Sequence, residues 1–182
     1  MHIVAICGSM RRDSINRKLL HALAKRAPEG VTVTIAELHG IPVYDGDVEA
    51  EGFPPAVTAL QDQIAAADGV ILGSPEYNGG VPGPLKNAID WCSRGRMQEV
   101  FAGRPFGLVG ATPGPSGTRS AQGAWLSTFR VLGVDAWLAG MLFVPHAQRA
   151  LGDDGTITDE RTERYTQRYI DGFVDFIRSR QR

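Results

Sequence analysis

Two short, almost wholly apolar runs constrain the fold of this chain more than any other feature of its sequence. They are residues 2–7 (HIVAIC) and 69–73 (GVILG), and a glycine or a proline follows each of them closely. A strand that is apolar on both faces must be covered on both faces, as in the middle of a parallel sheet. Segments of helical period lie between such runs, so the sequence predicts an α/β fold.

Further strands and helices are expected around this pair. Residues 31–38 alternate between apolar and polar side chains, which is typical of an edge strand with one wetter face. Two more strands are expected at residues 104–112 and 135–144, and helices near residues 15–23, 57–64, 85–92 and 120–132 and from 158 onward. The last helix should bury Tyr165, Tyr169, Phe173, Phe176 and Ile177. Right-handed crossovers then favour a doubly wound, five-stranded parallel sheet of order 2-1-3-4-5.

The length and the charge of the chain narrow its possible partners. Its 182 residues, 43% of them hydrophobic, suit a single domain over residues 1–182. With 19 basic and 20 acidic residues, the chain has no general attraction for nucleic acid or for an anionic membrane. A small-molecule partner is therefore expected.

The cysteines and histidines carry no metal or disulfide pattern. Cys7 and Cys92 lie far apart, and the four histidines share no ligand spacing. We therefore expect neither a metal site nor a structural disulfide. The early apolar run is much shorter than a signal-peptide core or a membrane-spanning helix, which predicts a cytoplasmic protein.

Three loops could carry chemistry, and two of them, at residues 8–16 and 74–83, should meet at one place. A doubly wound sheet binds ligands beyond the carboxyl ends of its strands, where the strand order reverses, here between the first and third strands. The first loop opens the segment GSMRRDSINRKLL, residues 8–20, and offers Ser9, Arg11, Ser14 and Asn16. Hydroxyl, amide and guanidinium groups at the start of a helix suit a phosphate. It has neither a Walker nor a GxGxxG pattern. An ordinary helix start, capped by Asp13 or Ser14 with solvated arginines, is the alternative.

The second loop lies within GSPEYNGGVPGPLKNAIDW, residues 73–91. Its glycines allow the backbone to lie against a flat ligand, and its prolines stiffen the flanks, with Pro84 in the first turn of a helix. Glu76, Tyr77 and Asn78 would then form the rim of the site. The alternative is a rigid turn in which Tyr77 packs on a neighbour.

The third loop is ATPGPSGTRSAQ, residues 111–122. Gly114 and Gly117 keep its backbone open, and Arg119 offers a positive charge. Hydroxyls are offered by Thr112, Ser116 and Thr118. A flexible connector is the alternative interpretation.

Together, GSMRRDSINRKL and PEYNGGVPGPLKNAIDWCSR resemble the phosphate loop and the flavin-ring loop of the NADPH-dependent FMN reductase family. This flavodoxin-like group includes bacterial quinone, azo-dye and chromate reductases. The resemblance implies bound FMN and NADPH or NADH as electron donor. It places the FMN phosphate on Ser9, Arg11, Ser14 and Asn16, the isoalloxazine ring on Pro75, Glu76, Tyr77, Asn78 and Gly79, and backbone contacts at Gly114 and Ser116. The family's arginine stands two residues before the glutamine, whereas Arg119 stands three before Gln122, so no specific flavin role is carried over to it.

The implied activity is a ping-pong reduction of quinones or similar acceptors, such as flavins, azo dyes or chromate, by NAD(P)H. FMN carries the chemistry, so no catalytic side chain is expected. The alternatives are a flavodoxin-type electron carrier, disfavoured because such carriers are usually strongly acidic, and a flavin-binding sensor. Leu85, Ile89, Trp91 and Cys92 cover more of a helix than one buried stripe requires, which predicts a homodimer or a dimer of dimers.

Overall fold

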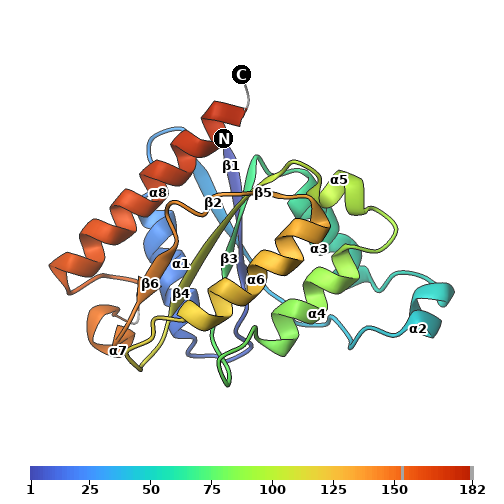
Figure 1. Cartoon of the computed structure of the whole chain (residues 1–182), viewed down its shortest axis with the longest axis horizontal. Helices are drawn as coiled ribbons and strands as arrows, with labels where there is room; N and C mark the ends of the chain where they lie inside the picture. The colour runs from blue at the N-terminus through green and yellow to red at the C-terminus, as the bar shows by residue number, and fades with distance from the viewer. Residues whose placement is uncertain (153, 181–182) are drawn as a thin grey trace.

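The computed structural model describes residues 1–152 and 154–180, which form a central parallel sheet with helices on both faces (Figure 1). The strands are β1 (His2–Cys7), β2 (Thr32–Ala36), β3 (Gly69–Gly73), β4 (Pro105–Ala111), β5 (Asp135–Ala136) and β6 (Leu142–Val144). Their order is β2-β1-β3-β4-β5, with β6 also paired to β4, and every pair is parallel. The predicted flavodoxin-like order and the edge position of the second strand are confirmed.

The single fifth strand expected at residues 135–144 is wrong. Both β5 and β6 pair with β4, but the chain leaves the sheet between them. The cause is Trp137, whose ring packs 5.0 Å from Tyr169 and 5.6 Å from Phe173 on the C-terminal helix. The other side of the indole lies against Gly140, where a side chain would collide with it. The strand is therefore interrupted to seat a large ring.

The alternation of side chains along β1 divides the core into two layers. Ile3, Ala5 and Cys7 face α1 (Ile15–Lys25) and α8 (Glu160–Arg180). Val4 and Ile6 face the opposite layer, which contains α3 (Pro55–Ala65), α4 (Gly83–Cys92) and α6 (Arg119–Leu132). Both faces of β1 and β3 are buried, as their apolar runs predict. The short helices α2 (Gly46–Glu51), α5 (Met97–Phe101) and α7 (Ala147–Ala150) were not expected.

The buried face of α8 is shorter than predicted. Tyr169, Phe173 and Ile177 are buried, but Tyr165 is 48% exposed. The first turns of α8 extend past the edge of the sheet (Figure 1), and Tyr165 lines an open hollow beside β6 instead of packing under the helix. The prediction that Tyr165 belongs to the core is wrong.

The wide apolar surface of α4 is covered within the chain itself. The Trp91 indole N–H donates to the carbonyl oxygen of Pro42 at 2.9 Å, and its ring packs edge-on against Tyr44 at 4.9 Å and Phe53 at 6.2 Å. The segment around α2 therefore covers Trp91, while Leu85, Ile89 and Cys92 are buried in the core. The wide apolar surface of α4 therefore no longer supports the prediction of a homodimer or a dimer of dimers.

No helix in the described part of the chain is long and apolar enough to cross a membrane.

Candidate functional site

The loops that follow β1, β3 and β4 meet at the edge of the sheet where the strand order reverses, as the topology requires. They enclose a hollow of about 90 Å³, which we call the switch-point hollow. Of the predicted site residues, it brings together Ser9, Arg11, Ser14, Asn16, Pro75, Glu76 and Tyr77. Its lining does not include Asn78, Gly79, Gly114 or Ser116. It includes Thr112, one of the hydroxyl residues of the third loop, and it adds Asp13, Ile15, Ala111 and Pro113, which were not expected to contact a cofactor.

Two buried hydroxyl groups line the first loop. Ser14 is the N-cap of α1, and its Oγ accepts a hydrogen bond from the Arg17 N–H at 3.1 Å. The Ser9 Oγ accepts from the Arg11 N–H at 3.4 Å. Each hydroxyl also has its own hydrogen to donate, and the Ser14 Oγ lies 3.9 Å from the Cys7 Sγ as well, where either atom can be the donor. The capping interpretation of Ser14 is confirmed, and it is compatible with a phosphate ligand.

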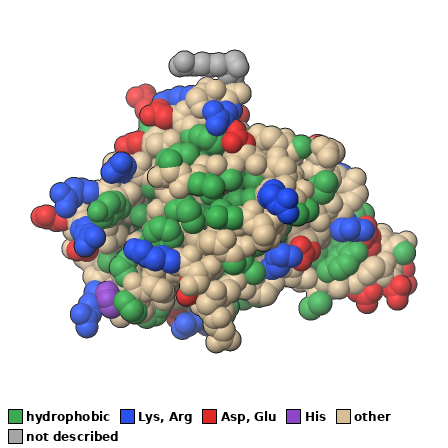
Figure 2. All heavy atoms as spheres, in the orientation of Figure 1, with side chains coloured by type: hydrophobic (Ala, Val, Ile, Leu, Met, Phe, Trp, Pro, Cys, Tyr) green, Lys and Arg blue, Asp and Glu red, His purple; other side chains and the backbone are tan. Residues whose placement is uncertain are grey.

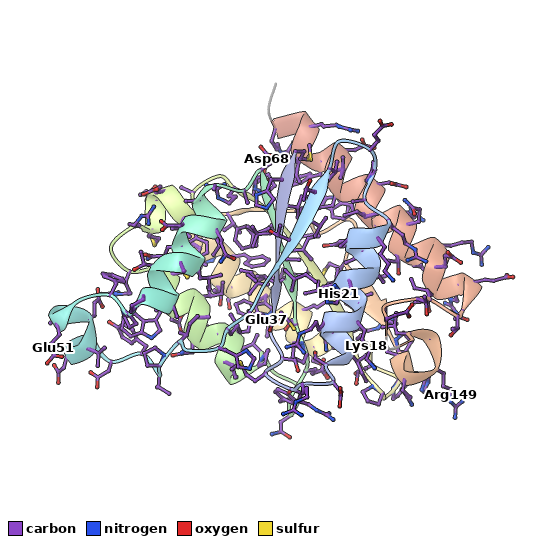
Figure 3. All side chains as sticks on the ribbon, turned by 180° about the vertical axis from the view of Figure 1, so that it is seen from behind. Lys18, His21, Glu37, Glu51, Asp68 and Arg149 are labelled. Atoms are coloured by element: carbon purple, nitrogen blue, oxygen red, sulfur yellow. The ribbon has the colours of Figure 1, made fainter. Side chains whose placement is uncertain are left out.

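Arg17, which the sequence analysis did not select, holds the main chain of the first loop. Its Nη1 donates to the carbonyl oxygens of Arg11 at 2.9 Å and Arg12 at 2.8 Å, while Nε and Nη2 form two bonds with the Glu37 carboxylate at 2.7 and 2.9 Å. The hydrogen bond with Glu37 raises the pKa of the Arg17 guanidinium above its usual value. Glu37 follows β2 and lies beside α1 (Figure 3). No local sequence pattern predicts this contact, because Arg17 and Glu37 belong to different elements.

The Asn16 amide ties the first loop to the third. Its Nδ2 donates to the Ala111 carbonyl oxygen at 3.0 Å, and its Oδ1 accepts from the Ala111 N–H at 2.9 Å. This pair fixes the start of α1 against the end of β4. One N–H of the amide is left for a ligand.

The second loop contains a tight turn at residues 77–80. Tyr77 N–H donates to the Gly80 oxygen at 3.3 Å, and Gly80 N–H donates to the Tyr77 oxygen at 3.0 Å. Asn78 and Gly79 have φ angles of 52° and 72°, the signature of a type I′ turn, which Asn-Gly favours. The rigid turn of the alternative interpretation is present, and Tyr77 is 49% exposed within it. The turn protrudes beyond the sheet as the green loop between β3 and α4 (Figure 1).

Glu76 connects the second loop to α6. Its Oε2 accepts from the Ala121 N–H at 3.1 Å, in the first turn of that helix. Thr118, at the N-cap position of α6, provides no side-chain cap. The Glu76 carboxylate therefore serves as the cap, a role that the sequence analysis missed because the two residues lie far apart in the chain.

The third loop is fixed at both ends. The Thr112 N–H donates to the Val144 carbonyl oxygen at 3.1 Å, and the Thr112 carbonyl oxygen accepts from the Ala147 N–H at 3.0 Å. The Gly114 carbonyl oxygen accepts from the His146 N–H at 3.1 Å. At the other end, the Gln122 amide donates to the Thr118 hydroxyl at 3.0 Å. The flexible-connector interpretation is wrong.

Neither cysteine has the lowered pKa that activates a thiol as a nucleophile. Cys7 lies at the end of β1 beneath the first loop, and burial raises the pKa of its thiol. Burial also raises the pKa of Cys92 to about 12. Both cysteines are free. Among the described residues, no group of three or more histidine, cysteine, aspartate or glutamate side chains could hold a metal ion.

A doubly wound sheet with hydroxyl and guanidinium groups at its switch point defines the class of proteins that bind a phosphorylated cofactor there. Residues 1–154 match the NADPH-dependent FMN reductase family, and the chain belongs to this family. It is thus an oxidoreductase with FMN as cofactor and NAD(P)H as donor.

Relatives match the chain over nearly its whole length. It is 35% identical to a 2-hydroxy-1,4-benzoquinone reductase of a Burkholderia species, over all of this chain and 98% of that protein. It is 36% identical to an NAD(P)H-dependent FMN reductase of Pseudomonas aeruginosa, over 97% and 95% of the two chains. Its structure resembles FerB, a flavoenzyme NAD(P)H:(acceptor) oxidoreductase from Paracoccus denitrificans, with a TM-score of 0.89, 33% identity and 98% coverage of both chains.

The switch-point hollow fits the phosphate end of FMN. Two buried hydroxyls can donate, the Arg11 guanidinium stands at the rim, and the first N–H groups of α1 have no partner within the helix. The hollow is smaller than the roughly 300–1,000 Å³ that encloses a whole small-molecule ligand. It therefore suits one end of the cofactor only.

Proposed function

We propose that this protein is an NAD(P)H:quinone oxidoreductase that uses FMN and reduces quinones or similar small-molecule acceptors. The observation that carries the proposal is the switch-point hollow, with its phosphate-binding donors, in a chain that a benzoquinone reductase matches over its whole length. The likeness to FerB, a named NAD(P)H:(acceptor) oxidoreductase, supports the same reaction class.

The proposed roles of the side chains follow from their positions. Ser9, Ser14 and Arg11 would donate to the cofactor phosphate, with the remaining N–H of Asn16 as a fourth donor. The second loop would hold the ring through Pro75, Glu76, Tyr77, Asn78 and Gly79, and Gly114 and Ser116 would add main-chain contacts. Bound at these residues, FMN would supply the hydride-accepting and electron-donating chemistry of the reaction. The half-exposed Tyr77 would border the open face on which both substrates stack.

The absorption spectrum of the purified protein tests this proposal. We expect a flavin band that NADPH or NADH bleaches without oxygen and that a benzoquinone restores. Initial rates at several fixed quinone concentrations should give the parallel lines of a ping-pong mechanism. Protein that binds no flavin after incubation with FMN, or reduced protein that quinones do not reoxidise catalytically, would contradict the proposal. The second result would instead indicate an electron carrier.

We further propose that the protein assembles as a homodimer or a dimer of dimers. The support is an apolar hollow of about 450 Å³ beside the first loop, lined by Met10, Leu38, Ile41, Val43 and Pro84 among others. Val43 is 83% exposed, and burial of such a surface in a symmetric contact would stabilise the assembly. Light scattering should give a mass at least twice the 19.6 kDa of one chain. The variant Val43→Asp should shift the measured mass toward that of the monomer. A wild-type monomer at micromolar concentration would contradict the proposal.

We place the enzyme in the cytoplasm, where NAD(P)H is regenerated. Cell fractionation tests this location, and recovery of the protein outside the cytoplasmic fraction would contradict it.

A further inference from the structure

A second, larger hollow lies on the other side of the third loop. It has a volume of about 480 Å³ and is bounded by β6, by α7 and by the start of α8. Arg119, Arg149 and Arg161 line it from three different helices. Basic side chains gather at this end of the molecule (Figure 2), and Arg149 projects outward from α7 (Figure 3). We call this the basic hollow.

The three guanidinium groups are not used by the fold. Within residues 1–152 and 154–180, no hydrogen bond or ion pair engages any of their side chains. Arg119 lies over the Phe143 ring at 4.8 Å, and Arg161 over the Tyr165 ring at 5.6 Å. Both contacts orient a planar cation while leaving its N–H groups free to bind an anion.

One acidic residue, Asp159, lines the hollow itself. Its Oδ2 accepts from the Thr162 N–H at 2.7 Å and the Thr162 hydroxyl at 2.6 Å, which caps α8, and its negative charge also acts on Arg161. Glu163, in the first turn of α8, pairs with Arg26 at 2.9 Å. The positive charge of the three arginines is therefore only partly offset at this position.

The walls of the basic hollow are also held in an unusual backbone shape. The described residues with positive φ other than glycine are Asn78, Thr118 and His146. His146 lines the hollow, and Thr118 immediately precedes Arg119. Such conformations are strained and concentrate at ligand sites. In the basic hollow, these strained residues shape a wall whose arginine side chains make no hydrogen bond or ion pair within the described residues.

We propose that the basic hollow binds the phosphorylated adenosine end of NADPH, with the three arginines around the 2′-phosphate. A phosphate monoester carries a charge of about −1.5 to −2 at neutral pH, which matches several guanidinium groups better than one carboxylate does. The volume suits a nucleoside, and the Phe143 and Tyr165 rings offer apolar surface beside the cations. This inference rests on the proposed function, because it assigns a site to the electron donor.

The position of the hollow supports a donor that spans two sites. Thr112 and Pro113, near the start of the third loop, line the switch-point hollow, while Arg119, near its other end, lines the basic hollow. A dinucleotide has two ends joined by a pyrophosphate. Its nicotinamide end can therefore reach the flavin while its adenosine end crosses the third loop.

The test uses adenosine 2′,5′-bisphosphate and the FMN-loaded enzyme. Isothermal titration calorimetry should detect binding to the wild type, and the double variant Arg149→Gln/Arg161→Gln should bind at least tenfold more weakly, since it loses two charge-assisted hydrogen-bond donors. The KM for NADPH should rise at least tenfold at unchanged kcat, and the KM for NADH should not change. Arg130→Gln, an exposed arginine of α6 that does not line the hollow, is the matched control.

Several results would overturn the assignment. The bisphosphate could fail to bind, or bind the double variant as well as the wild type. Equal increases in KM for NADPH and NADH would show that the arginines do not recognise the 2′-phosphate. Binding that does not compete with NADPH would overturn the assignment to the donor. Failure of the proposed function is distinguishable from all of these, because the titration needs no turnover and the NADH reaction reports the flavin chemistry alone.

Discussion

The first and second loops around the switch-point hollow are held in opposite ways. The first loop depends on distant side chains, because Arg17 binds its carbonyl groups and Asn16 binds Ala111 across the molecule. The turn at residues 77–80 closes on itself through two main-chain hydrogen bonds, and a side chain added at Gly79 would meet nothing within 4 Å. A loop of the first kind is sensitive to changes elsewhere in the fold, whereas one of the second kind depends on its own residues. The predictions below follow the expected loss of apoprotein stability, from largest to smallest.

Asn16→Leu should have the largest effect on the apoprotein. It removes both partners of Ala111, whose main chain is buried, and each buried polar group without a partner costs about 1–3 kcal/mol. We expect a loss of about 2–4 kcal/mol in urea unfolding. Ser9→Ala is the control, with a loss of about 1 kcal/mol or less, because Ser9 makes only a long, local bond. If Asn16→Leu is as stable as the wild type, the first loop does not depend on this distant contact, and its contrast with the turn at residues 77–80 is wrong.

Gly79→Val should cost about 1–2 kcal/mol, because a residue with a Cβ disfavours the left-handed conformation that this turn requires. The apoprotein should still fold, whereas FMN should be lost or loosely held. Gly79→Asn is the control, since asparagine adopts positive φ more readily, and it should restore most of the stability. The melting temperature of the apoprotein and an FMN titration measure the two effects. Normal FMN affinity in a destabilised Gly79→Val would show that the turn is structural only.

Glu76→Ala should destabilise the apoprotein by about 1 kcal/mol through loss of the cap on α6, a decrease of about 2–4 °C in melting temperature. Glu76→Gln keeps an oxygen acceptor and should recover part of this loss. Differential scanning calorimetry of both variants without FMN makes the measurement. If the two variants melt together at the wild-type temperature, the link between the second loop and α6 contributes nothing.

Arg11→Ala should leave the apoprotein unchanged and weaken FMN binding roughly 10- to 150-fold, the loss expected for a charge-assisted hydrogen bond. Its exposed side chain lines the switch-point hollow, whereas the exposed neighbour Arg12 does not. Arg12→Ala is therefore the matched control. Equal FMN affinity in the two variants, measured by fluorescence quenching, would remove Arg11 from the phosphate site.

The local patterns predicted most of the sheet and much of the site. The apolar runs of β1 and β3 required burial on both faces, and the resulting strand order placed the first and second loops together before any contact was known. Ser14 as a cap and Pro84 in the first turn of α4 were also readable, because capping and proline geometry depend on a few neighbouring residues.

The sequence by itself therefore determined the fold class, the switch point and the residue types gathered there, because periodicity, caps and turns are local properties. Only the tertiary structure decided which of those side chains remain free. Asn16 is engaged by Ala111, Glu76 by α6, and Trp137 interrupts the last strand, each through a partner far away in the chain. Such contacts depend on how strands and helices are brought into register, and no local pattern records that register. The same reason hid the basic hollow, whose three arginines come from helices that only the folded sheet brings together.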